Sequence, residues 1–154
     1  MYRILAYLIP VLICFGVGLT ASYFQSDAIQ NWYPTLKKPL LTPPDIVFPI
    51  AWSILYLCMG ISIGLIIDSA SKRIRPLIKL FAFQLFFNFT WSITFFYFEN
   101  PLVGFINIII LDVLVINYAI KSYPERKASA YLFIPYIIWV LFATYLNGYI
   151  MIYN

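Results

Sequence analysis

The chain alternates between long apolar stretches and short polar segments, and five of the apolar stretches are long enough to cross a lipid bilayer. A helix needs about 20 apolar residues to span the hydrocarbon core. Backbone polar groups in lipid must bond to one another, so such spans are helices or closed barrels, and no stretch alternates as a barrel strand does. The sequence therefore predicts an all-α integral membrane protein, a single domain of residues 1–154 with five transmembrane helices. The predicted helices cover residues 4–24, 46–67, 77–98, 102–120 and 128–149.

Composition agrees with this class and excludes several kinds of site. Of the 154 residues, 63% are hydrophobic and 10% are charged, whereas a soluble domain carries roughly 25% charged residues. The chain has no histidine and only two cysteines, which excludes a zinc site built from about four His and Cys ligands and any His-dependent triad. There is no Gly-rich phosphate loop and no basic cluster. We therefore expect the lipid bilayer as surroundings, no metal and no nucleic-acid partner.

Basic residues are distributed unequally between the two predicted sides of the membrane. Eight lie on the side of the N-terminus: Arg3, Lys72, Arg73, Arg75, Lys79, Lys121, Arg126 and Lys127. The connection between the first two helices holds the other two, Lys37 and Lys38. Basic loops stay preferentially in the cytoplasm. This bias predicts a cytoplasmic N-terminus.

The connection between the first two helices, predicted as residues 25–45, is the one long loop. It contains Trp32, Tyr33 and four prolines: Pro34, Pro39, Pro43 and Pro44. Proline lowers the entropic cost of holding a loop in one shape, and long ordered loops are often functional. One interpretation is a lid over a cavity. The other is an interfacial loop whose aromatic residues rest among lipid headgroups.

Three predicted helices combine large aromatic residues with amides or small residues on one face. These faces consist of Phe48, Trp52, Tyr56 and Met59; of Gln84, Asn88 and Trp91; and of Trp139, Ala143, Leu146 and Asn147. The amides could form hydrogen bonds between helices, worth about 0.6 kcal/mol each. They could also be the few polar anchors of an apolar ligand pocket, which would accept large planar molecules because aromatic faces stack well. Spacing alone leaves both interpretations open.

Two further features of the spans have a predicted role. Asp112 falls near the middle of the fourth span, where a carboxylate is a functional candidate. We expect it to be neutral and hydrogen-bonded to an amide or hydroxyl of a neighbouring helix; proton coupling is the alternative. Gly60 and Gly64 form a GxxxG pattern, which favours a close helix crossing within the chain or across a dimer.

Three segments resemble a known family, in order along the chain. They are WYPTLKKPLLTPPDIVFPIAWSILYLCMG (32–60), QLFFNFTWSITFF (84–96) and PYIIWVLFATYLNGYI (135–150). Together they resemble the tryptophan-rich sensory protein family, also called the translocator protein or peripheral benzodiazepine receptor family. The length suits a bacterial member in the cell membrane. One departure is Leu40 and Leu41, which stand where the family often has serine and an aromatic residue.

The resemblance implies a bundle of five transmembrane helices, a homodimer, and a cavity closed by the loop between the first two helices. It implies porphyrins such as protoporphyrin IX and haem, and drug-like molecules such as the isoquinoline carboxamides, as ligands. The implied pocket residues are Tyr33, Pro43, Pro44, Trp52, Gln84, Asn88, Trp91, Trp139, Ala143, Leu146 and Asn147.

The function expected from the resemblance is binding of tetrapyrroles within the membrane. Bacterial members of the family are associated with light-dependent degradation of protoporphyrin IX. An electron-rich indole can donate an electron to a photoexcited porphyrin, and Trp52 and Trp139 are the candidate catalytic residues. No cofactor is expected, since the porphyrin is the ligand or the substrate. A transporter or exporter of tetrapyrroles and a sensor of porphyrin level remain the alternatives.

Overall fold

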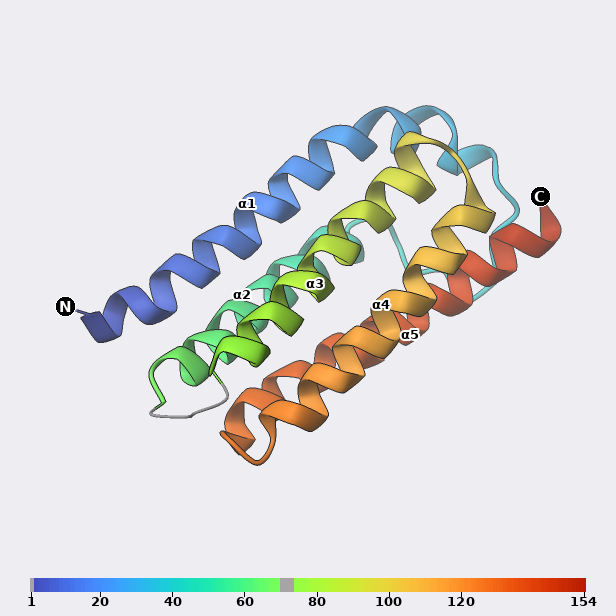
Figure 1. Ribbon diagram of the computed structural model, residues 1–154. Coiled ribbons are helices and arrows are strands. Elements are labelled where there is room, and N and C mark those ends of the chain that lie inside the picture. Colours follow the sequence, from blue (N-terminus) through green and yellow to red (C-terminus); the bar gives the residue numbers. More distant parts are fainter. Residues whose placement is uncertain (1, 70–73) are drawn as a thin grey trace.

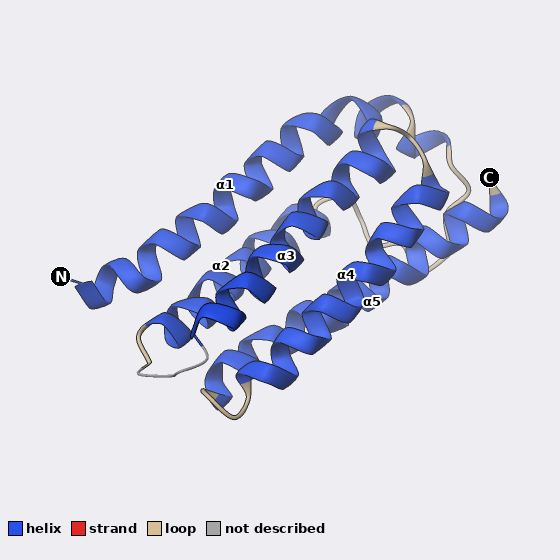
Figure 2. Cartoon of the chain, viewed as in Figure 1, coloured by secondary structure: helices blue, strands red, loops and turns tan. Residues whose placement is uncertain are grey.

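The computed structural model describes residues 2–69 and 74–154, and every long element in these ranges is a helix (Figures 1 and 2). The elements are α1 (Tyr2–Asn31), η1 (Tyr33–Thr35), α2 (Val47–Ile67), α3 (Ile74–Ser92), η2 (Ile93–Tyr97), α4 (Pro101–Ser122) and α5 (Lys127–Tyr153). Among the described residues, five helices are long and apolar enough to cross a membrane. The predicted fold class is therefore confirmed. Of the basic residues used to predict orientation, Lys72 and Arg73 lie outside the described residues, and the cytoplasmic N-terminus stays a prediction.

The helices form an antiparallel bundle in which α1 packs on α2 and α3, α2 packs on α5, and α4 lies between α3 and α5. The chain therefore enters at one end of the bundle and leaves at the other (Figure 1). The cavity described below lies at the end where α1 and α5 finish and α2 begins.

Glycines allow α1 and α2 to touch along one half of their length. A Cβ atom on Gly60 would lie 2.5 Å from the Cα of Val11, and one on Gly64 would lie 2.9 Å from the carbonyl oxygen of Ala6. Close approach of this kind is the usual role of small residues between membrane helices. The GxxxG pattern therefore serves a crossing within the chain.

The largest difference from the predicted boundaries is at the end of α1, which continues past residue 24 to Asn31. The apolar run ends near Phe24, but the following segment, QSDAIQN, contains neither proline nor glycine, so nothing in it interrupts the helix. Hydropathy marks where a chain leaves the lipid, and a helix can extend beyond that point. The α1–α2 connection is consequently residues 32–46, with η1 inside it.

Hydrogen bonds between polar side chains connect α2, α4 and α5. Ser62 of α2 donates to the backbone oxygen of Ser129 at 2.8 Å, and its oxygen lies 3.3 Å from the hydroxyl of Tyr118 in α4. Thr144 of α5 donates to Asp112 at 2.8 Å, which confirms the predicted hydrogen bond between this carboxyl group and a hydroxyl of a neighbouring helix. The Ser62 bonds join α2, α4 and α5 at the end away from the cavity, and the Thr144 bond joins α5 to α4 beside Ala143, which lines the cavity.

Candidate ligand-binding site

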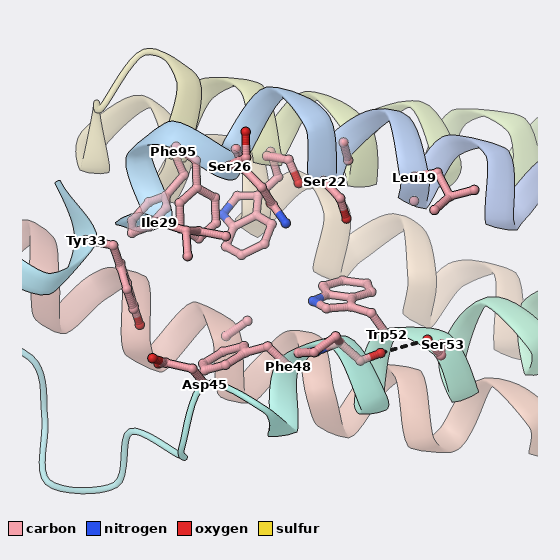
Figure 3. Close-up of a pocket in the computed structure, with 18 of the residues that line it drawn as sticks. Leu19, Ser22, Ser26, Ile29, Tyr33, Asp45, Phe48, Trp52, Ser53 and Phe95 are labelled. Carbon is pink, nitrogen blue, oxygen red and sulfur yellow. Dashed lines mark hydrogen bonds between the residues drawn. The ribbon is translucent and has the colours of Figure 1, made fainter. Parts of the chain in front are cut away.

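A cavity of about 540 Å³ lies between α1, α2, η2 and α5, beneath the α1–α2 connection (Figure 3). This volume falls within the range of roughly 300–1,000 Å³ typical of small-molecule sites. Aromatic side chains make up much of its wall: Phe15, Tyr33, Phe48, Trp52, Tyr56, Trp91, Phe95 and Phe96. Serines, amides and one carboxylate supply the polar groups. The cavity thus has the composition of a site for an apolar ligand with few polar anchors.

Trp52 occupies the centre of this aromatic wall. Its ring stacks on Tyr56 with centroids 5.6 Å apart and lies 6.4 Å from Trp91. On the side away from the cavity it meets Tyr136 at 6.2 Å and Trp139 at 6.5 Å, both approaching edge to face. Aromatic pairs at these separations are each worth about 0.5–1.5 kcal/mol beyond the burial of their area. The neighbours therefore hold the Trp52 indole in one orientation.

Buried hydrogen bonds hold the side chains below Trp52 in place. Tyr56 donates to the Asn88 side-chain oxygen at 3.1 Å, and the Asn88 amide nitrogen donates to the Tyr136 hydroxyl oxygen at 2.8 Å. Nearby, the Trp91 indole nitrogen donates to the Asn147 side-chain oxygen at 3.1 Å. The oxygen and the nitrogen of the Asn88 amide each form one of these bonds, so Asn88 links α2, α3 and α5.

The α1–α2 connection is fastened over the end of the cavity. The Tyr33 ring packs on Phe96 with centroids 5.7 Å apart, and the Lys38 ammonium group lies 4.5 Å from the centre of the same ring. The backbone N–H of Lys37 donates to the Asn154 side-chain oxygen at 2.8 Å, and the Asn154 amide donates back to the Lys37 carbonyl at 3.2 Å. These contacts fix the connection at both α5 and η2.

Charge at the cavity is confined to its rim. Asp45 is the one charged residue among the described residues that line it, and Figure 3 shows the hydroxyl end of Tyr33 pointing toward the Asp45 carboxylate. Burial, and then the nearby charge of Asp45, raise the pKa of Tyr33 to about 12. Tyr33 is therefore a neutral phenol at physiological pH.

The side of the cavity is open between α1 and α2. Leu19 and Ser22 of α1 and Ser53 of α2 line the cavity and are also exposed on the outside of the bundle; Leu19 is 72% exposed. Figure 3 shows these side chains on facing helices, with Ser53 bonded to the carbonyl of Pro49. This gap begins where the close glycine contacts of α1 and α2 end. An apolar molecule dissolved in the bilayer would meet the opening directly.

Comparison with known proteins agrees with this architecture. A sequence model of the TspO/MBR family matches residues 10–153. The chain belongs to the TspO/MBR family. It is 37% identical to the tryptophan-rich protein TspO of Archaeoglobus fulgidus, over 99% of both chains. It is 33% identical to the protein of that name from Chlorobaculum tepidum, over 94% of this chain and 93% of the relative. It is also 32% identical to protein CrtK of Rhodobacter capsulatus, over 87% and 83% respectively.

This TspO/MBR family protein brings some of the residues implied by the resemblance together at the cavity and leaves others outside it. The ones that line the cavity are Tyr33, Trp52, Trp91, Ala143, Leu146 and Asn147. The ones that do not are Pro43, Pro44, Gln84, Asn88 and Trp139. Trp139 lies directly behind the wall, 5.8 Å from Phe48 and 6.5 Å from Trp52 between ring centroids. Gln84 and Asn88 lie deeper in α3.

Sequence reasoning missed the contribution of α1, which forms one whole side of the site. The α1 residues include Phe15, Leu19, Ser22, Gln25, Ser26 and Ile29. Their spacing of three or four residues places them on one face of a helix. The periodic signal was therefore present, but the polar residues after Phe24 indicate a loop in the sequence. Asp45 does lie in the α1–α2 connection, where no helical periodicity marks it as facing the cavity.

The TspO/MBR family and the five apolar helices together establish a multi-pass integral membrane protein. Family membership also supports a receptor or sensor role in the membrane.

Proposed function

We propose that this protein binds porphyrins, such as protoporphyrin IX and haem, and planar drug-like molecules in the cavity beneath the α1–α2 connection. The observation that carries the proposal is the 540 Å³ cavity with the Trp52 indole at the centre of an aromatic wall. A flat, conjugated ligand gains most from such a wall because its faces can stack on aromatic rings.

Charge suggests how a porphyrin would be oriented. The interior of the cavity has no basic group among the described residues that line it, and its rim has one carboxylate, Asp45. Burying an unpaired charge is costly. The acidic side chains of a porphyrin would therefore remain at the rim, turned away from the Asp45 carboxylate and toward Lys38, which lies against Tyr33, and the apolar edge of the macrocycle would point toward Trp52.

Binding is tested by quenching of tryptophan fluorescence on titration with protoporphyrin IX in the dark. Saturable quenching is expected, and Trp52→Ala should weaken binding about tenfold because it removes both stacking and buried area. Trp32→Phe is the matched control, since Trp32 does not line the cavity. Quenching that never saturates, or equal affinity of the Trp52→Ala protein, would refute the proposed site.

We propose photo-oxidation of the bound porphyrin as a second activity, on the basis of the Trp52 and Trp139 pair. Light makes a porphyrin a one-electron oxidant, which can take an electron from the Trp52 indole and become a radical anion. The radical anion passes this electron to dioxygen, which becomes superoxide. The Trp52 radical cation then takes an electron from the porphyrin, and the porphyrin radical cation combines with superoxide, so the net reaction adds dioxygen to the porphyrin and restores Trp52. Trp139, at 6.5 Å, can share the oxidised state of Trp52 by electron exchange until that step. The light absorption and the redox chemistry belong to the porphyrin, and the protein supplies the electron donor and positions it.

The photochemical proposal is tested by illuminating the porphyrin complex in air and following the loss of its absorption spectrum. Replacing both Trp52 and Trp139 with phenylalanine should abolish product formation and retain much of the dark binding. Product at the wild-type rate in this double variant would exclude the two indoles as donors.

The geometry favours binding over transport. The cavity reaches one end of the bundle, while the glycine contacts of α1 with α2 and the Ser62–Tyr118–Ser129 hydrogen bonds occupy the other end. Tetrapyrrole flux across sealed vesicles that contain the protein would reverse this preference.

A further inference from the structure

Gln84 is the most poorly satisfied polar side chain in the described part of the chain. It is 0% exposed in the middle of α3, and neither its side-chain oxygen nor its nitrogen has a hydrogen-bond partner among the described residues. Asn88 and Trp91, on the same face of α3, are both bonded to neighbouring helices. A buried amide without partners carries its full desolvation penalty, and lipid tails offer no hydrogen bonds.

A second unused hydrogen-bonding group lies close by. The Tyr136 hydroxyl oxygen accepts a hydrogen bond from the Asn88 amide at 2.8 Å. Its own hydrogen has no acceptor within residues 2–69 and 74–154, although Tyr136 is 0% exposed. The interior therefore holds a free hydroxyl donor and a free amide acceptor on neighbouring helices.

The two unpaired groups flank Asn88. Gln84 lies one helical turn before Asn88 on the same face of α3, and Asn88 is the residue that bonds the Tyr136 hydroxyl. A molecule that accepts from Tyr136 and donates to the Gln84 oxygen must be small enough to fit inside the bundle and able to do both. Water has these properties, and buried waters typically make about three hydrogen bonds to otherwise unsatisfied groups.

We propose that Gln84 and Tyr136 bind an internal water molecule within the membrane-embedded part of the bundle. The water completes the hydrogen bonds of the network formed by Tyr56, Asn88 and Tyr136. Trp52 stacks on Tyr56 and meets the edge of Tyr136. The water therefore also helps to hold the Trp52 ring in its orientation at the cavity. The site is separate from the ligand cavity, because neither Gln84 nor Tyr136 lines it, and it does not depend on the identity of the ligand.

The site is tested by nuclear magnetic resonance in lipid nanodiscs. The chain has three glutamines, Gln25, Gln30 and Gln84, so replacing the first two with glutamate leaves Gln84 as the only source of a glutamine side-chain signal. With nitrogen-15 glutamine, we expect a cross-peak between the Gln84 amide hydrogens and the water resonance. Tyr136→Phe should weaken this cross-peak, because it removes one of the two groups that hold the water.

Thermal unfolding provides a second measurement that does not need resonance assignment. Gln84→Met has nearly the same volume but cannot bond to water, and it should lower the unfolding midpoint by a few degrees. Gln30→Met, at an exposed position of α1, is the control and should leave the midpoint unchanged. A missing water cross-peak, or a higher midpoint for Gln84→Met as expected from removing an unpartnered amide, would overturn the proposal.

Discussion

Asn154 controls how firmly the α1–α2 connection covers the cavity, and its replacement with alanine should speed the release of a bound porphyrin. Its side chain forms two hydrogen bonds with the backbone of Lys37, at 2.8 and 3.2 Å. In the sequence these residues are far apart, so the pair closes a long loop of chain. Alanine at this position removes both bonds, together with the bond that the Asn154 amide donates to the Ile150 carbonyl at the end of α5.

The size of the effect follows from these two bonds. Each is exposed, so each contributes about 0.5–1 kcal/mol, the lower part of the range for a net hydrogen bond. Together they stabilise the closed connection by about 1–2 kcal/mol. If release requires the connection to lift, the dissociation rate should rise about 5- to 30-fold, since 1.4 kcal/mol corresponds to a factor of ten.

The assay is stopped-flow displacement of protoporphyrin IX by excess competitor, with tryptophan fluorescence as the signal. Asn154→Asp keeps the acceptor for the Lys37 N–H and loses the donor, so it should give an intermediate rate. Asn31→Ala is the control, because its exposed amide donates to Asp27 in its own helix and not to the connection. An unchanged dissociation rate in Asn154→Ala would show that release does not require this contact to open.

Three further predictions concern the helix crossing, the side opening and the rim. Gly60→Val should destabilise the bundle by about 1–3 kcal/mol, the usual cost of overpacking, because its Cβ would meet the Val11 backbone. Gly16 faces open space, so Gly16→Ala should leave the stability unchanged. Thermal unfolding of the two variants measures the difference. Ser53→Trp should slow the association of a ligand added in vesicles and its dark dissociation by similar factors, because a narrower opening obstructs passage in both directions, and an unaltered association rate would exclude the gap between α1 and α2 as the route. The pKa of Tyr33 is raised from 10.0 to about 12, so the fold favours the neutral phenol. The stability that this contributes is present below pH 10 and is lost as the pH rises to 12. A difference titration at 295 nm between wild type and Tyr33→Phe should show one phenol ionising near pH 12.

The membrane class, the five spans and the family were predictable from the order of the amino acids. These properties depend on local features: the length of an apolar run decides whether a helix can cross the bilayer, and three ordered segments carry the family pattern. The close crossing at Gly60 and the hydrogen bond of Asp112 were also predictable, because a small residue or a carboxyl group in lipid has few alternatives.

Which residues form the cavity depends on how the helices pack against one another. Periodicity places Gln84, Asn88 and Trp91 on one face of α3, but it does not state how deep each lies, so it could not show that Trp91 lines the cavity while the two amides lie below it. Trp139 is separated from the cavity by the thickness of the wall that contains Trp52. The role of Asn154 depends on its contact with Lys37, which lies 117 residues away in the sequence. Depth and long-range contact arise from how the helices pack together, and a pattern within a single helix contains no information about its neighbours.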